Sequence, residues 1–342
     1  MLFIALIATL CGAKSCVGYA DFAVTNLEYL AQFVDFPHGA PSHDCFSRLF
    51  RLLDPAQMER ILQDFARTLR QALGLKPNTN VIACDGKRMK RGYERGRSFM
   101  PPLMVSVWDT QTRLSIAARA SSDGNEVAAT LEVLKSLDLK GSWVVADALH
   151  CHPEMAAEIR DKGGHYALKL KANNAPLFAC ANRAFAQAEA KGELTFHMTQ
   201  EKAHDRLERR LASVVMAPAD APRLPGLVMF GRIESERQVA GKKPSFYTHY
   251  VALSKAKTPK TMLKLVRSYW GVENNCHWQL DVAFDADGCR TRKDNGPKNI
   301  SIIRRISLDI LRAHPLDVSI QRKTQLAAWN KEFRDELITH MR

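Results

Sequence analysis

Two short apolar runs in the middle of the chain constrain its fold more than any other feature. Residues 81–85 read VIACD and residues 143–147 read WVVAD, so each run ends on an aspartate. Apolar runs of this length predict buried strands. Helical patterns at residues 126–137 and 153–162 flank the second run. Strands that alternate with helices in this way favour an α/β fold with a mixed sheet.

The segments around these two strands complete the expected order of elements. Residues 1–75 have a helical pattern, in which Ser42 is a good N-cap after Pro41. The pattern further along predicts a hairpin of residues 104–109 and 113–119, a strand at 165–170, a β-rich insertion at about 176–254, helices at 259–280 and 299–314, and a polar tail from 315.

The chain opens on an apolar run, MLFIALIATLCG, that resembles the core of a signal peptide. No Lys or Arg precedes the run, and it is too short to cross a bilayer. We therefore favour a buried first helix over a secreted protein. The absence of a polar lead-in also suggests that the chain lacks an N-terminal piece that longer relatives possess.

The charge balance indicates a polyanionic partner. The 49 Lys and Arg residues outnumber the 36 Asp and Glu residues, which gives a formal net charge of +13. Nucleic acid is favoured over an anionic membrane, because the basic residues do not gather on one face beside a lipid-facing stripe. The eight cysteines include no pair with the two-residue spacing of a zinc knuckle, and the run His150-Cys151-His152 has no second cluster to complete a zinc site.

Three carboxylates are candidates for a divalent metal site. Asp85 and Asp147 stand at the carboxyl ends of their strands, the edge of an open α/β sheet where ligands bind. Glu273, in the helical run YWGVENNCHW, is the natural third ligand. A single aspartate after a strand more often caps the next turn, and a single helical Glu is more often merely exposed. Spacing alone leaves these alternatives open.

Four separated motifs closely resemble the H-repeat-associated, ISAs-type family of insertion-sequence transposases. They are PSHDCFSRLFRLLDP at 41–55, DGKRMKRG at 85–92, WVVADALHCHPEMAAEIRDKGGHYALKLKANNAPL at 143–177 and YWGVENNCHWQLDVAFDADGCRTRKDNGPKNISIIRRISL at 269–308. The resemblance implies a ribonuclease H-like mixed sheet flanked by helices, of the Asp-Asp-Glu (DDE) class. It implies a helical N-terminal domain at residues 1–76, a catalytic domain at 77–314 with the β-rich insertion, and a C-terminal tail at 315–342.

The resemblance also implies the chemistry. Asp85, Asp147 and Glu273 would hold two Mg²⁺ ions, for which Mn²⁺ can substitute. One ion would activate water or a 3′ hydroxyl, and the other would stabilise the leaving oxygen of an in-line phosphodiester displacement. The substrates would be the terminal inverted repeats of the element and its target DNA. We expect a homo-oligomer on DNA, in the cytoplasm with the nucleoid and away from membranes.

Basic and amide residues inside the motifs are candidates for gripping DNA phosphates. They are Lys87, Lys171, Asn173, Arg290, Arg292, Lys293, Arg304 and Arg305. A solvated charged face is the alternative for this set. We further expect Asn274, His277 and Trp278 to order the Glu273 helix, and Trp270 and Trp278 to belong to the core rather than to stack on bases.

The sequence departs from the family pattern in two places. The glycine that usually follows Asp-Gly-Lys closely is displaced to Gly92, and the usual Glu-Asp-Asp appears as Ala286-Asp287-Gly288. The lost carboxylate at 286 and the abrupt start support an alternative function, a truncated or inactive remnant that binds DNA without catalysis. All three candidate ligands are present, so we favour retained catalytic architecture.

Overall fold

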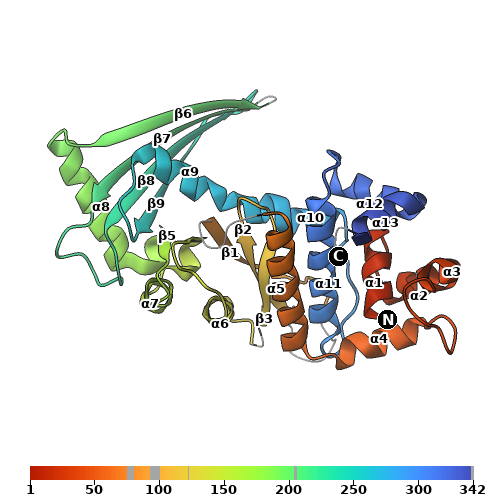
Figure 1. Ribbon diagram of the computed structural model, residues 1–342. Coiled ribbons are helices and arrows are strands. Elements are labelled where there is room, and N and C mark those ends of the chain that lie inside the picture. Colours follow the sequence, from red (N-terminus) through yellow and green to blue (C-terminus); the bar gives the residue numbers. More distant parts are fainter. Residues whose placement is uncertain (75–80, 93–100, 122, 204–205, 340–342) are drawn as a thin grey trace. The chain divides into compact units, whose positions relative to one another are not determined.

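The computed structural model describes residues 1–74, 81–92, 101–121, 123–203 and 206–339 (Figure 1). The chain forms two compact units. Unit 1 comprises Met1–Lys76, Asp85–Val133 and Val272–Arg342, and unit 2 comprises Pro77–Cys84 and Leu134–Gly271. The boundary expected between residues 76 and 77 lies outside the described residues.

The N-terminal part of unit 1 is helical, as expected. Its helices are α1 (Leu2–Leu10), α2 (Cys16–Thr25), α3 (Leu27–Leu30), α4 (His43–Leu52) and α5 (Pro55–Ala72). The Ser42 side chain caps α4 by accepting from Cys45 N, and Asp54 caps α5 by accepting from Ala56 N. The apolar face of α1 is buried, including Ile4, Ile7 and Leu10, which confirms the expected buried first helix. In the described part of the chain, no helix has the length and apolar character needed to cross a membrane.

Within the described residues, nine strands form one mixed sheet in the order β3-β2-β1-β4-β5-β9-β8-β7-β6. The strands are β1 (Val81–Arg88), β2 (Leu103–Asp109), β3 (Ser115–Ser121), β4 (Trp143–Ala146), β5 (His165–Leu170), β6 (Thr195–Ala203), β7 (Arg206–Met216), β8 (Met229–Val239) and β9 (Ser245–Leu253). Strand β4 pairs in parallel with β1 and with β5, whereas β9 pairs antiparallel with β5. The expected hairpin of β2 and β3 is present. This mixed sheet and the helices around it confirm the expected α/β fold class.

The insertion of unit 2 differs in detail from the expectation. Strands β6 to β9 make up its β-rich part, and Figure 1 shows them side by side as long arrows. The start of the insertion is a helix, α8 (Ala175–Ala190), which the sequence analysis missed. Its alanines favour a helix, and Phe178 and Phe185 pack against Tyr250 with ring centroids 5.3 and 5.7 Å apart.

The remaining helices of unit 2 flank its strands. They are α7 (Pro153–Asp161) and α9 (Pro259–Ser268), and helix α6 (Glu126–Lys135) crosses the boundary between the two units. Helix α9 contacts β6, β7 and β8, and its Met262 side chain lies against Gly231 of β8. A Cβ at Gly231 would lie 3.0 Å from the Met262 sulfur, so the close approach of helix and strand depends on glycine at this position.

Helices also form the C-terminal part of unit 1. They are α10 (Trp278–Val282), α11 (Gly296–Ala313), α12 (Ile320–Trp329) and α13 (Lys331–Thr339). The segment expected to be a polar tail therefore consists of two helices. Arg334 of α13 donates to the carbonyl of Ala327 at 2.9 Å and to Asn26 Oδ1 at 3.0 Å, which ties the C-terminus to the N-terminal helices.

Helix α11 is buried along nearly its whole length and contacts α1, α4, α5, α12 and β3. Figure 1 shows it beside α5. Several buried polar groups on α11 are hydrogen-bonded, which offsets the cost of removing them from water. Arg305 donates to Ser106 Oγ on β2 at 2.9 Å, and both carboxyl oxygens of Asp309 accept from Ser115 N on β3, at 3.2 and 3.1 Å. These contacts fix α11 to the sheet.

The buried Asp309 makes the stability of the protein depend on pH. Burial raises its pKa to about 8 from 3.8, although the charge of Arg312 and the hydrogen bond from Ser115 act in the opposite direction. The folded state thus keeps a proton that the unfolded chain loses, and stability falls as pH rises from about 4 to about 8. Asp309→Asn keeps an acceptor for Ser115 and does not titrate. We expect its free energy of unfolding to rise relative to the parent by up to about 1.4 kcal/mol per pH unit in this window.

Urea unfolding of both proteins across pH 4 to 8 measures this difference. An Asp309→Asn variant whose difference from the parent stays constant with pH would show that the carboxyl group is ionised throughout.

Candidate active site

The two candidate aspartates follow residues that are partners in the sheet. Cys84 of β1 and Ala146 of β4 are register partners in a parallel pair, and Asp85 and Asp147 are the next residues along the chain. The expectation that both runs are strands is confirmed. The expected strand end is correct for Asp147, which follows β4 directly, but it is wrong for Asp85, because β1 continues to Arg88.

A cluster of ligand atoms lies in unit 1 around Asp85. The described residues Asp85, Glu273 and His277 each place one ligand atom within 4.8 Å of the others. The Asp85 Oδ2 atom lies 3.2 Å from His277 Nδ1, and both side chains are buried. Glu273 is exposed, so its carboxylate is accessible from solvent. Two carboxylates and an imidazole are a donor set that divalent cations accept.

The helical segment around Glu273 has an unusual form. Val272–His277 is a π-helix, followed directly by α10. Val272, Cys276 and His277 of this segment are buried, whereas Glu273 and Asn274 are exposed. The segment therefore presents Glu273 outward and His277 inward. Sequence reasoning predicted a helix here but assigned His277 only the role of ordering it, and missed the imidazole as a candidate ligand.

The lysines of the Asp-Gly-Lys motif lie in a network of carboxylates. Lys87 Nζ lies 2.7 Å from Asp281 Oδ2 and 3.0 Å from Asp287 Oδ1, and Lys90 Nζ lies 2.5 Å from Asp287 Oδ2. Burial raises the pKa of Asp287, but the hydrogen bonds from Lys90 and Lys87 outweigh it and hold the pKa below its usual value. The segment Ala286-Asp287-Gly288 departs from the family pattern but keeps Asp287, which forms ion pairs with both lysines. The sequence analysis missed Asp281 and Asp287 as partners of these lysines.

This network borders a cavity of about 350 Å³ in unit 1, whose lining includes Lys87, Arg88, Glu273, His277 and Trp278. The cavity is thus lined both by basic side chains, Lys87 and Arg88, and by the acidic side chain of Glu273. The Glu273 carboxylate lies at a hollow that is wide enough for more than a bound ion and its waters.

Asp147, in unit 2, is held by the turn that follows its strand. Its Oδ1 atom accepts from Leu149 N at 2.9 Å and lies 3.0 Å from Nδ1 of the buried His150. Burial raises the pKa of Asp147, but the contact with His150, the hydrogen bond from Leu149 and the charge of Lys169 outweigh it and lower the pKa. Asp147 therefore caps a 3₁₀ turn (Ala148–His150), and it is ionised at neutral pH.

The residues expected to grip DNA fall into three groups. Lys171, Arg290 and Lys293 are exposed. Asn173 and Arg292 each donate to a backbone carbonyl, of Ala148 at 2.9 Å and of Arg91 at 3.1 Å, and Lys87 is paired with the carboxylates described above. Arg304 and Arg305 are only 4% and 1% exposed.

The expectation that Arg304 and Arg305 grip DNA phosphates is corrected by their burial. Arg304 donates to the carbonyl of Lys14, and Arg305 bonds to Ser106 and Ser301, so their guanidinium groups stabilise the interior of unit 1. Buried groups with internal partners do not reach a DNA phosphate, and we leave these two residues out of the proposed DNA surface.

The tryptophans also differ from the expectation. Trp270 of unit 2 is 52% exposed and Trp278 of unit 1 is 56% exposed, so neither belongs to the core. The ammonium group of Lys169 lies 4.8 Å from the Trp270 ring centroid, which is a cation–π contact. The expectation of core tryptophans is wrong because the apolar faces of these helical segments are filled by other residues, such as Tyr269 and Leu280.

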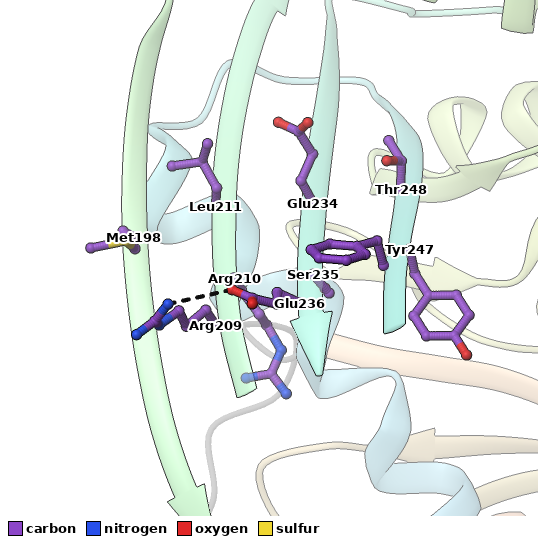
Figure 2. A pocket seen from close by; sticks show the side chains of 10 residues that line it. Met198, Arg209, Arg210, Leu211, Glu234, Ser235, Glu236, Tyr247 and Thr248 are labelled. Carbon is purple, nitrogen blue, oxygen red and sulfur yellow. Dashed lines mark ion pairs between the residues drawn. The ribbon is translucent and has the colours of Figure 1, made fainter. Parts of the chain in front are cut away.

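A second hollow of about 280 Å³ lies on the strands β6 to β9 of unit 2 (Figure 2). The register places Met198, Leu211, Glu234 and Thr248 in one row across the four strands. Figure 2 shows Arg209 paired with Glu236 beside this row. The hollow mixes apolar side chains with charges of both signs, and its described lining has no cluster of metal-ligating groups.

Two family profiles match the chain. The profile described as "Transposase DDE domain" matches residues 76–309, and the profile described as "DDE_Tnp_1-associated" matches residues 1–66. The first match alone covers more than half of the chain and includes Asp85, Asp147 and Glu273.

The chain is also similar to individual proteins over most of their length. The chain is 29% identical to "Putative protein YbfL" and 28% identical to "H repeat-associated putative transposase YhhI", both of Escherichia coli (strain K12), and each alignment covers 97% of this chain and 90% of the relative. A Xanthobacter autotrophicus protein named for its position in a dhlA 3′ region is 32% identical over 71% of this chain and 82% of its own length.

Among solved structures, a piggyBac transposase synaptic complex with hairpin DNA aligns with 99% of this chain and 75% of its own chain, at 10% identity and a TM-score of 0.42. The predicted resemblance to H-repeat-associated transposases is confirmed by the two profiles and the named relatives, and this chain belongs to the DDE-domain transposase family, with the helical domain associated with that family at its N-terminus.

Proposed function

We propose that this chain is a metal-dependent DNA transposase that cuts and joins DNA strands at the ends of an insertion sequence. The observation that carries the proposal is the cluster of Asp85, Glu273 and His277 in a chain that matches the transposase DDE family. In this proposal Asp85, Asp147 and Glu273 hold two Mg²⁺ ions, for which Mn²⁺ can substitute. Its partners are the terminal repeats of the element, the target DNA and further copies of the chain.

The residues present fit a divalent cation. Their donors are hard carboxylate oxygens and one imidazole. The Nε2 atom of His277 is buried and has no hydrogen-bond partner among the described residues. A buried polar atom without a partner costs free energy, so the His277 imidazole keeps a nitrogen that favours a ligand. When bound, the ions would polarise the phosphodiester and lower the pKa of the attacking hydroxyl or water.

The side chains of the protein prepare this chemistry before DNA arrives. His277 fixes the carboxylate of Asp85, and His150 and Leu149 fix that of Asp147 and keep it ionised. Groups that are already oriented do not have to be reorganised during the reaction. The exposed Lys171, Arg290 and Lys293 supply positive charge for the DNA backbone.

The third ligand can be tested by Glu273→Gln, which removes the negative charge and keeps the size of the side chain. We expect loss of metal-dependent nicking and strand transfer, by at least about 100-fold, with unchanged DNA affinity. The assay uses labelled DNA that carries the element ends, with Mg²⁺ or Mn²⁺. Glu332→Gln, at an exposed position in the first turn of α13, is the matched control and should cut normally.

Cleavage by Glu273→Gln at the parental rate would exclude this residue as a ligand. If the parent and the variant both bind DNA and neither cuts it under any metal condition, the chain is a non-catalytic DNA-binding remnant.

Metal binding by Asp147 can be tested separately from its capping of the turn. Asp147→Asn retains an oxygen that accepts from Leu149 N, so the turn should persist, but the ligand charge is lost. We expect a rise of about 10-fold or more in the Mn²⁺ concentration for half-saturation, measured by calorimetry. Asp138→Asn is the control, because Asp138 caps a turn by accepting from Lys140 N at 3.0 Å. Equal metal titrations of the two variants would make Asp147 a cap only.

The exposed basic residues after Glu273 can be tested by salt dependence. Replacing Arg290 and Lys293 with Gln should weaken binding to all DNA sequences and lower the slope of log affinity against log salt by about 1 to 2, because fewer counterions are released. The control removes the exposed Lys140 and Lys191, which changes the net charge equally. A slope equal to that of the parent would show that the Arg290 and Lys293 side chains face only solvent.

A further inference from the structure

The π-helix that carries Glu273 needs a specific stabilising contact. A π-helix pairs each N–H with the carbonyl five residues earlier, and such turns are rare and concentrate at functional sites. The segment Val272–His277 has this form over six residues. A regular α-helix through the same residues would rotate Glu273 and His277 relative to the rest of unit 1. The contacts that favour the π form therefore decide where the Glu273 carboxylate lies.

Arg312, near the end of α11, makes such a contact. Its Nη2 atom donates to the carbonyl oxygen of Asn275, in the middle of the π-helix, at 2.5 Å. Its Nη1 atom donates to the carbonyl oxygen of Arg113, in the turn between β2 and β3, at 2.7 Å. The guanidinium thus joins the π-helix to the hairpin turn.

The surroundings of Arg312 hold its guanidinium in place. Its central carbon lies 4.7 Å from the ring centroid of Trp108, a fully buried side chain on β2. The Arg113 residue that accepts from Nη1 has a φ of +60°, which fixes the direction of its carbonyl in an unusual backbone conformation. The buried Cys276 adds a second contact between the π-helix and β3, because its sulfur lies 3.9 Å from Ser115 Oγ.

The chemistry of the side chain fits this task. A planar guanidinium donates in two fixed directions and stacks on an aromatic ring at the same time. The ammonium of a lysine has no plane to stack, and it does not hold two carbonyls in a fixed relative orientation. The mechanism above does not use Arg312.

We propose that Arg312 is a positioning residue for the third carboxylate: by binding the carbonyl of Asn275 it holds the π-helix in the register that places Glu273 beside Asp85. This inference rests on the proposed function, in which Glu273 is a metal ligand. Groups that orient metal ligands typically change metal affinity or activity by about 10- to 100-fold when they are removed.

The test compares Arg312→Lys with a matched arginine. Arg334 in α13 makes the same kinds of contact, since it donates to the carbonyl of Ala327 at 2.9 Å and lies 4.7 Å from the Tyr29 ring, and these partners lie outside the π-helix. Arg334→Lys therefore also removes a guanidinium that binds a backbone carbonyl and stacks on a ring. Both variants keep the positive charge, and thermal unfolding establishes that each is folded at the assay temperature.

Three measurements are made on the full-length variants. Hydrogen–deuterium exchange of peptides that cover residues 272–277 reports the π-helix directly, without metal or DNA. Calorimetric titration with Mn²⁺ reports the metal site, and cleavage of element-end DNA at saturating DNA reports the reaction. For Arg312→Lys we expect faster exchange in residues 272–277, about 10-fold weaker Mn²⁺ binding and at least about 10-fold slower cleavage. For Arg334→Lys we expect parental values in all three.

The outcomes separate the two proposals. Parental exchange and Mn²⁺ binding in Arg312→Lys would overturn the positioning role, whatever the activity. Equal losses in Arg312→Lys and Arg334→Lys would also overturn it, because they would show general destabilisation. If Arg312→Lys loosens residues 272–277 but Glu273→Gln binds Mn²⁺ like the parent, the contact is real and the assignment of Glu273 as a ligand fails.

Discussion

The burial of α11 is the constraint on which the rest of unit 1 depends. A helix that is enclosed on nearly all sides has to find partners for its polar groups inside the protein. Four polar side chains of α11 bond to four different elements: Asn299 donates to the Phe50 carbonyl of α4, Arg305 bonds to β2, Asp309 accepts from β3, and Arg312 reaches the π-helix. Because α1 and α5 pack on the same helix, the N-terminal helical domain and the Glu273 segment share one core element. A change in that core is therefore expected to reach the candidate active site.

The sequence predicted the parts of the site that depend on local pattern. The two apolar runs predicted strands β1 and β4, since a buried strand of this length can be recognised from a few residues. The aspartate marked the end of β4 but not of β1, which continues to Arg88. The sequence did not predict the contact of His277 with Asp85, because that contact depends on a π-helix, and no periodicity in the run marks one. A signal was nevertheless present. Glu273 and His277 are four residues apart. In a helix this spacing brings two side chains to one face, which indicates a possible pair of ligands.

The basic cluster after Glu273 shows how charge alone misleads. Arg304 and Arg305 were grouped with Arg290 and Lys293 because they are close in sequence. The run NISIIRRISLDIL around them is amphipathic, because Ser301, Arg305 and Asp309 follow one another at a spacing of four and form a polar stripe. The fold buries this stripe as well, and the arginines bond inside the protein, to Lys14 and Ser106. Burial in the folded protein, and not the sign of the charge, distinguishes a structural arginine from one available to DNA.

Capping and metal binding were treated as alternatives for a strand-end aspartate, but the geometry of Asp147 makes them compatible. Both contacts of the cap are made to Oδ1, and a carboxylate is planar, so fixing one oxygen also sets the direction of the other. The same contacts lower the pKa and favour the charged form that a cation requires. Asp85 is oriented in a similar way by the imidazole of His277. In both units, a histidine from a helical segment contacts the carboxylate of a candidate aspartate. Such a pairing limits the entropy that the side chain loses when a cation binds, which is the physical advantage of a ligand that is already held by the fold.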